Sequence, residues 1–206
     1  ATGDSAMRAE SRRSFWLLVG NGAIVMMGSA FFSFETVMAG MAFTLTGSTV
    51  LVGLLTTVAT SGWLWPQLIV GSRIEHLPRK MPVYKLSISL RMGGLLLMIA
   101  ATWFFAGQPH LLYWLILFTT AIFATGGGIC VIPFMDIVAK TIPVHHRPML
   151  FAWRRFLGGL LGFLAGIATF YILSAESGLR YPENYGVLLL AGFSLCALAY
   201  SLFMRT

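Results

Sequence analysis

A carboxylate inside a long apolar run is the residue of this sequence best suited to proton chemistry. Glu35 lies within the apolar stretch Phe15–Ala39, and Asn21, Gly28 and Glu35 are spaced by seven residues. In a helix, this spacing places all three on one face. A carboxyl group in apolar surroundings either bonds to a neighbouring helix or carries a proton or contacts a substrate, and the sequence leaves these roles open.

Two further polar residues are candidates for contact with a substrate. Thr125 precedes the three consecutive glycines Gly126–Gly128, and Arg155 lies near the start of the next apolar stretch. Glycines loosen a helix and admit close neighbours. An arginine at a helix end either extends to the membrane surface or lines an inner vestibule and attracts an anion. We therefore group Thr125 and Arg155 with Asn21 and Glu35 as candidate cavity or proton-binding residues.

Enzymatic chemistry is not expected, because the residues it needs are not suitably placed. The four histidines all lie in polar connections, so none can pair with a serine inside an apolar stretch, and no Gly-x-Ser-x-Gly motif occurs. The sequence has no phosphate-binding loop and no spaced set of metal ligands. Cys130 and Cys196 fall inside apolar stretches and are interpreted as buried hydrophobic residues. We expect no enzyme activity, not even that of an intramembrane serine protease, and no cofactor or metal.

The composition indicates a membrane protein. Of the 206 residues, 57% are hydrophobic and 10% are charged, and the mean hydropathy is +0.81. Soluble domains usually contain about 25% charged residues. The formal net charge of +7 would suit nucleic acid, but the basic residues cluster between apolar stretches, where they face anionic lipid headgroups. We expect the lipid bilayer as a partner and no nucleic acid.

Six apolar stretches are long enough to cross the hydrocarbon core as helices, which takes about 20 residues. They predict an all-α, polytopic membrane protein with a six-transmembrane-helix bundle over residues 15–206, preceded by a cytoplasmic tail over residues 1–14. The expected spans are Phe15–Ala39, Thr49–Val70, Val83–Ala106, Leu111–Val138, Met149–Leu173 and Tyr185–Met204.

The distribution of lysine and arginine predicts the orientation in the membrane. With the N-terminus inside, the inner segments and inner helix ends hold 13 of the 14 basic residues, and only Arg180 lies outside. Cytoplasmic segments are enriched in Lys and Arg, so both termini are expected in the cytoplasm. We expect an integral protein of a bacterial inner membrane.

The connection after the second span carries a compact pattern of charges. Gly71 opens it, Glu75 follows four residues later, and the basic pair Arg79 and Lys80 closes it. A glycine lets two helices approach closely where a membrane helix ends. The acid can hold a base nearby. We expect Asp136, at the inner end of the fourth span, to join this loop in one charge cluster that stabilises one conformation.

This charged connection resembles the signature of the major facilitator superfamily, which lies between the second and third transmembrane helices. The signature contains a glycine, an acid and two closing basic residues; here Glu75 replaces the aspartate, His76 the first base and Pro78 the second glycine. The region from Asp136 to Gly166 also resembles the family's fourth helix, loop and fifth helix. The resemblance covers almost the whole chain.

The resemblance implies the N-terminal six-helix half of a transporter, built from a 3+3 inverted repeat and working by alternating access. It implies that helices 1 and 4 line the central path, helices 2 and 5 meet a second six-helix half, and helices 3 and 6 lie outside. The stripe Gly158, Gly162 and Gly166 on helix 5 is expected to serve tight helix packing. Arg91 on helix 3 is expected to reach the inner surface or pair with an acid, and is a poor substrate ligand.

The expected function is therefore transmembrane transport of a small solute as a secondary transporter. The second half would lie in the same longer chain or in a separate polypeptide, and the start at Ala1 without a methionine favours a fragment or a split chain. Helix 4 lacks the arginine of many proton-coupled members and helix 5 lacks the Gly-Pro step of antiporters, so the coupling ion stays open. The alternative is a transporter-like subunit that does not transport and instead scaffolds or assembles a larger membrane complex.

Overall fold

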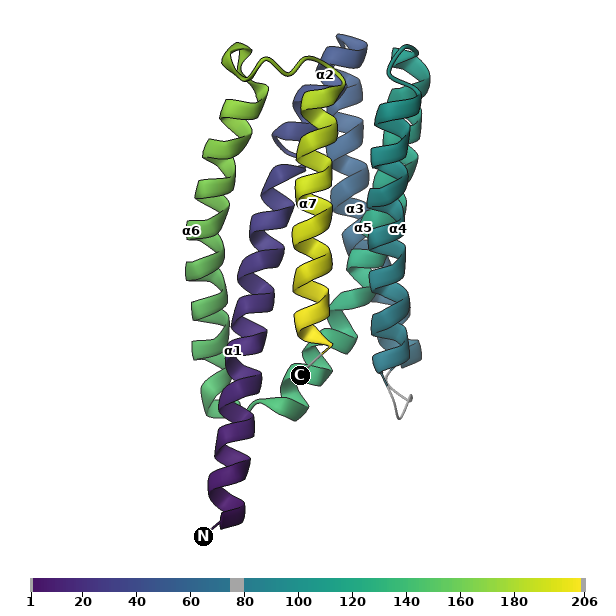
Figure 1. Ribbon diagram of the computed structural model, residues 1–206. Coiled ribbons are helices and arrows are strands. Elements are labelled where there is room, and N and C mark those ends of the chain that lie inside the picture. The colour runs from purple at the N-terminus through teal and green to yellow at the C-terminus, as the bar shows by residue number, and fades with distance from the viewer. Residues whose placement is uncertain (1, 75–79, 205–206) are drawn as a thin grey trace.

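The computed structural model describes residues 2–74 and 80–204, and within these ranges the regular structure is entirely helical. The long helices run side by side, and both termini lie at the same end of the bundle (Figure 1). The helices are α1 (Thr2–Phe31), α2 (Val37–Thr46), α3 (Thr49–Ile74), α4 (Met81–Phe104), α5 (Pro109–Thr141), α6 (Arg147–Leu173) and α7 (Glu183–Phe203), with single 3-10 turns at Val144–His146 and Ala175–Ser177.

Six of these helices are long and apolar enough to cross a membrane: α1, α3, α4, α5, α6 and α7. The prediction of an all-helical bundle with six membrane spans is confirmed at this level. Helices α3 to α7 begin and end within four residues of the predicted spans. The polar tail over residues 1–14 is continuous with the first span, because α1 already begins at Thr2.

The first predicted span, Phe15–Ala39, is wrong at its second end. α1 ends at Phe31, the backbone turns over residues 32–36, and the short apolar helix α2 begins at Val37. The amide of Met38 donates to the carbonyl oxygen of Ser33 at 2.9 Å and closes the turn. Glu35 therefore lies in this interruption and not on the α1 face that carries Asn21.

Aromatic packing against α5 accounts for the interruption. The ring of Phe123 on α5 lies 5.3 Å from the ring of Phe32 and 5.7 Å from that of Phe34, measured between centroids. In a regular helix, residues two apart do not share a face, so Phe32 and Phe34 could not both point toward Phe123. Ser33 and Thr36 tolerate the break, because their side chains compete with helical backbone bonds.

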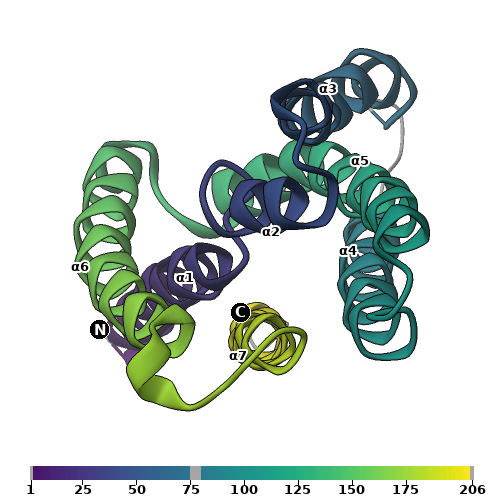
Figure 2. The ribbon, with the colours of Figure 1, turned by 90° about the horizontal axis from the view of Figure 1, so that it is seen from above.

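The helices form two packing groups. α1 packs against α6 and α7, whereas α5 packs against α3 and α4, and the α4–α7 contact joins the groups. α2 lies on α3 and α5. Seen from above, α1, α2 and α5 lie between α6 on one side and α3 on the other (Figure 2). The largest buried cluster includes side chains from both groups, among them Leu95, Met98 and Ile116 of α4 and α5, and Leu189, Cys196 and Tyr200 of α7.

Three glycines let α5 approach both of its neighbours closely. A Cβ atom on Gly126 would lie 2.9 Å from the carbonyl oxygen of Ser87 on α4, and one on Gly127 would lie 2.6 Å from the indole ring of Trp63 on α3. A Cβ atom on Gly128 would collide with the Trp63 carbonyl oxygen. The run Gly126–Gly128 thus holds α5 between α3 and α4.

α3 and α6 are the helices with the least contact inside the chain. The buried share of the apolar span is 17% in α3 and 11% in α6, against 44–50% in the other four. The predicted glycine stripe on α6 is divided accordingly. Gly158 is buried against Met26 of α1, whereas a Cβ on Gly162 or Gly166 would meet nothing within 4 Å. Two of its three members therefore lie on an open side of the helix.

Candidate functional site

Two adjoining cavities extend along α1 and α5 on the side between α3 and α6. The glutamate cavity, which Glu35 lines, has a volume of about 560 Å³. The arginine cavity, which Arg91, Arg154 and Arg155 line, has a volume of about 420 Å³. Three residues line both cavities, which are therefore direct neighbours: Val25, Met26 and Trp63.

The glutamate cavity combines one exposed carboxylate with hydroxyl groups. Glu35 projects from the interruption between α1 and α2, and Thr56 and Thr60 contribute from α3. Both threonine hydroxyls donate to carbonyl oxygens of their own helix, at 2.9 and 3.0 Å. Within the described ranges, no basic side chain lines this cavity. Glu35 is therefore the only charged side chain among the described residues that line this cavity.

Arg91 is the most deeply buried charge of the arginine cavity. Its side chain is 7% exposed, and its guanidinium carbon lies 4.6 Å from the ring centroid of Phe123, 5.7 Å from that of Trp63 and 5.9 Å from that of Tyr200. The faces of such rings attract a cation. Its Nε atom has no hydrogen-bond partner, and no carboxylate forms an ion pair with Arg91 among the side chains that the structure describes, those of residues 12–71, 80–174 and 176–204.

The expectation that Arg91 reaches the inner surface is therefore wrong, and none of the described carboxylates is the acid partner that was the alternative. The α5 glycines explain the difference, because they leave room for the side chain to cross their helix. A Cβ atom on Gly126 would lie 2.9 Å from Arg91 Cγ, and one on Gly127 would lie 3.8 Å from Arg91 Cζ. Arg91 thus lines the cavity although its own helix, α4, lies on the other side of α5.

Asn21 and Arg154 connect three helices at the wall of the same cavity. Arg154 Nη1 on α6 donates to the Leu18 carbonyl oxygen and, at 3.3 Å, to Asn21 Oδ1 on α1. Asn21 Nδ2 donates at 2.8 Å to the carbonyl oxygen of Ala199 on α7. A Cβ atom on Gly22 would displace the Arg154 guanidinium from this position.

The other two candidate cavity residues have different positions. Arg155 is exposed and lines the arginine cavity beside Arg154. Thr125 is half-buried and lines neither cavity. The structure thus brings Asn21 and Arg155 together with Arg91, and leaves Glu35 in the adjoining cavity. The sequence signals for this site are an arginine inside the third span and a glycine run in the fourth, and only the structure shows that they face each other.

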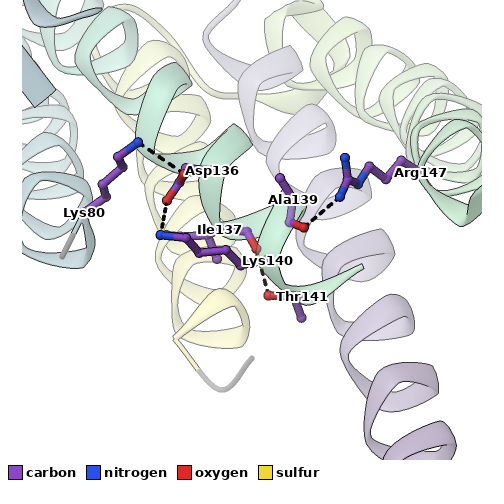
Figure 3. A network of polar contacts seen from close by, with 7 residues as sticks. All are labelled: Lys80, Asp136, Ile137, Ala139, Lys140, Thr141 and Arg147. Carbon is purple, nitrogen blue, oxygen red and sulfur yellow. Dashed lines mark hydrogen bonds and ion pairs between the residues drawn. The ribbon is translucent and has the colours of Figure 1, made fainter. Parts of the chain in front are cut away.

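The charge cluster at the end that carries both termini is centred on Asp136 (Figure 3). Its carboxylate lies 3.2 Å from Lys80 Nζ and 2.7 Å from Lys140 Nζ. Gly71 lies close to Ile132 on α5, since its Cβ would be 3.5 Å from that side chain. Glu75 and Arg79, the other predicted members, lie outside the described residues. The role of the cluster stays a prediction.

Arg147 closes the end of α5 next to this cluster. Its Nε donates to the Ile142 carbonyl oxygen at 3.0 Å, and its Nη2 donates to that of Ala139 at 2.7 Å (Figure 3). The last carbonyl groups of a helix lack partners within the helix, and a cation is favourable there. Arg147 therefore fixes the turn from α5 into α6.

Comparisons of the chain with family models, with curated proteins and with solved structures gave no match. The functional argument below therefore uses the residues and the geometry of this chain.

Proposed function

We propose that this chain is one half of a secondary transporter of the major facilitator type, which moves a small solute by alternating access. The two neighbouring cavities, open between α3 and α6, are the observation that carries the proposal, and we take them as two parts of one transport path. A path that is open along one side needs a second wall. A second six-helix bundle placed against α3 and α6 would supply it.

The contacts between helices support an inverted repeat of three helices. Such a repeat would relate α1 to α5, α3 to α6 and α4 to α7. Under this exchange, the α1–α6 contact corresponds to the α5–α3 contact, and the α1–α7 contact corresponds to the α5–α4 contact. The same exchange relates α3 to α6, which are the two least buried spans. Inverted repeats of this kind are common in secondary transporters, with the solute site at their interface.

In the proposed mechanism, this bundle rocks against the second one around the shared path. The Lys80–Asp136 pair holds one end of the bundle together and has to rearrange when that end opens. Glu35 is the candidate group for coupling to protons, because it is an exposed carboxylate inside the path. The end that carries both termini is proposed to face the cytoplasm of a bacterial cell.

A block of the path tests the transport function. Val25 lines both cavities, so Val25→Trp should fill the path and abolish uptake into proteoliposomes of every solute that the unmodified protein moves from a panel of sugars, amino acids, nucleosides and organic acids. Val50→Trp is the matched control, because Val50 is 78% exposed on α3 and lines neither cavity.

Equal uptake by the two variants would contradict the proposed path. If the unmodified protein moves no solute and purifies in fixed stoichiometry with unrelated membrane subunits, the scaffold function replaces the transport function. The orientation is tested separately by labelling an engineered cysteine at the exposed position Ser177 with an impermeant reagent. Labelling from outside intact cells agrees with the proposed topology.

A further inference from the structure

Arg91 carries a charge that the rest of the described chain leaves unbalanced. Lysine or histidine in such surroundings can lose its proton, but arginine stays charged in proteins. A buried charge is normally paired with an opposite one, because its separation from water is costly. Here the guanidinium meets three aromatic rings, and its Nε atom has no hydrogen-bond partner. Ring faces recover only part of the lost hydration.

The surroundings of Arg91 are arranged around an opening rather than closed by packing. Gly127 lines the cavity beside Arg91 and has no side chain, whereas a Cβ atom there would lie 3.8 Å from the guanidinium carbon. Two more arginines, Arg154 and Arg155, line the same cavity from α6. Of the residues that the structure describes, none with a carboxylate lines it. The cavity therefore concentrates positive charge without an internal counter-ion.

The rest of the cavity wall is apolar and aromatic. A volume of about 420 Å³ lies within the range of small-molecule sites, which begins at roughly 300 Å³. Such a site favours a ligand with one anionic group and an apolar body. The apolar lining residues are contributed by five helices and include Val25, Trp63, Val131, Phe134, Phe151 and Tyr200.

We propose that the arginine cavity binds the anionic group of an amphipathic organic acid, with Arg91 as the principal contact and Arg155 as the second. The guanidinium has a fork of N–H donors that matches a carboxylate. The same chemistry is offered by a free organic acid and by an anionic lipid headgroup. This inference deepens the proposed function, because it names the solute class of the transport path.

The test measures binding and not transport. The purified protein in phosphatidylcholine nanodiscs is titrated with benzoate and octanoate, and with their neutral amides, by ligand-observed NMR. Each carboxylate should bind at least tenfold more tightly than its amide, because a hydrogen bond to a charged group is the stronger one. Arg91→Gln should weaken carboxylate binding by about tenfold or more and leave amide binding unchanged.

Two further variants separate the site from a general effect of charge or folding. Lys85→Gln removes one positive charge from the exposed side of α4 and should leave binding unchanged. Arg155→Gln, at an exposed position that cannot disturb the core, should weaken carboxylate binding about threefold. Binding that survives in Arg91→Gln as well as in Lys85→Gln, or equal affinity for acid and amide, would overturn the proposal.

A lipid arm distinguishes the two sources of the anion. If phosphatidylglycerol in the nanodiscs displaces the carboxylates from the unmodified protein, the anion comes from the bilayer; if it does not, a free acid is the ligand. A protein that binds carboxylates but moves no solute keeps this inference and loses the transport function. A protein that moves only neutral or cationic solutes and binds no carboxylate keeps the function and loses this inference.

Discussion

The interface between α4 and α5 contains two charges that the fold treats in opposite ways. At one end, the carboxylate of Asp136 lies between Lys80 and Lys140, at 3.2 and 2.7 Å. In the middle, Arg91 is buried against three rings and has no carboxylate partner in the described part of the chain. The carboxylate of Asp136 is thus paired with two lysines near the surface, whereas the guanidinium of Arg91 is buried and has no carboxylate partner among the described side chains.

The difference separates a structural charge from a binding charge. A partly exposed ion pair costs little to form and contributes little, so its position at the helix ends serves to hold one arrangement. A buried charge without a partner lowers stability, and its presence needs a reason outside the free protein. Four substitutions test this contrast, beginning with the one of largest expected effect.

Gly126→Val should break the interface itself. The new side chain would meet the Ser87 carbonyl oxygen at 2.9 Å and the Arg91 backbone nitrogen at 3.0 Å, and neither backbone atom can move aside. We expect a loss of about 3 kcal/mol and a melting temperature in detergent about 5–10 °C lower. Gly93→Val on α4 is the control, because its Cβ meets nothing within 4 Å; equal losses would mean that helix propensity alone is responsible.

Arg91→Met should uncouple binding from stability. Methionine is similar in length, and replacing an unpaired buried charge with an apolar group is often neutral or stabilising. We expect an unchanged or higher melting temperature together with a loss of carboxylate binding of at least tenfold. Thermal unfolding and the benzoate titration, made on the same preparation, give both values. A clear fall in melting temperature would show that Arg91 is a structural residue after all.

Asp136→Asn should have a smaller effect, at the paired end of the interface. The substitution leaves Lys80 and Lys140 without their shared carboxylate, but Asp136 is 23% exposed and solvent screens the cluster. We expect a loss of about 1 kcal/mol or less at low salt, which becomes smaller in 0.5 M salt. Glu183→Gln, at the other end of the bundle, serves as the control. A salt-independent loss would point to packing rather than charge.

Lys140→Gln should have the smallest effect of the four. The side chain is 65% exposed and pairs with Asp136 across one helical turn, an arrangement worth about 0.3 kcal/mol. We expect a change in melting temperature below about 1 °C. Lys80→Gln should cost more, because Lys80 is only 15% exposed and joins α4 to α5. A larger loss of stability from Lys140→Gln than from Lys80→Gln would mean that the Asp136–Lys140 pair within α5 contributes most of the stability of the cluster.

The spans were predictable from the sequence, because a bilayer demands about 20 consecutive apolar residues and leaves few other readings. The interruption after Phe31 was not, because the segment Phe32–Thr36 keeps enough apolar residues to continue the pattern. Its cause is Phe123, about 90 residues later in the chain. A helix end that depends on such a distant contact leaves no local signal.

The candidate site was predictable only in part. The sequence identified Asn21 and Arg155 as cavity residues, but it assigned Arg91 to the surface or to an ion pair. Helical periodicity gives the side of its own helix on which a residue lies, not what the neighbouring helix leaves open. The missing information was that Gly126 and Gly127 face Arg91 across the interface, which requires the pairing of α4 with α5.

The interruption at residues 32–36 separates two helices that pack in different parts of the bundle. α1 belongs to the group with α6 and α7, whereas α2 rests on α3 and α5. The chain that follows the first span therefore passes from one packing group to the other, and five non-helical residues connect the two groups. A short connection of this kind limits how far the two packing groups can move apart, but it allows them to tilt relative to each other. The segment from α1 to α2 thus connects the two packing groups, and it also lines the cavities.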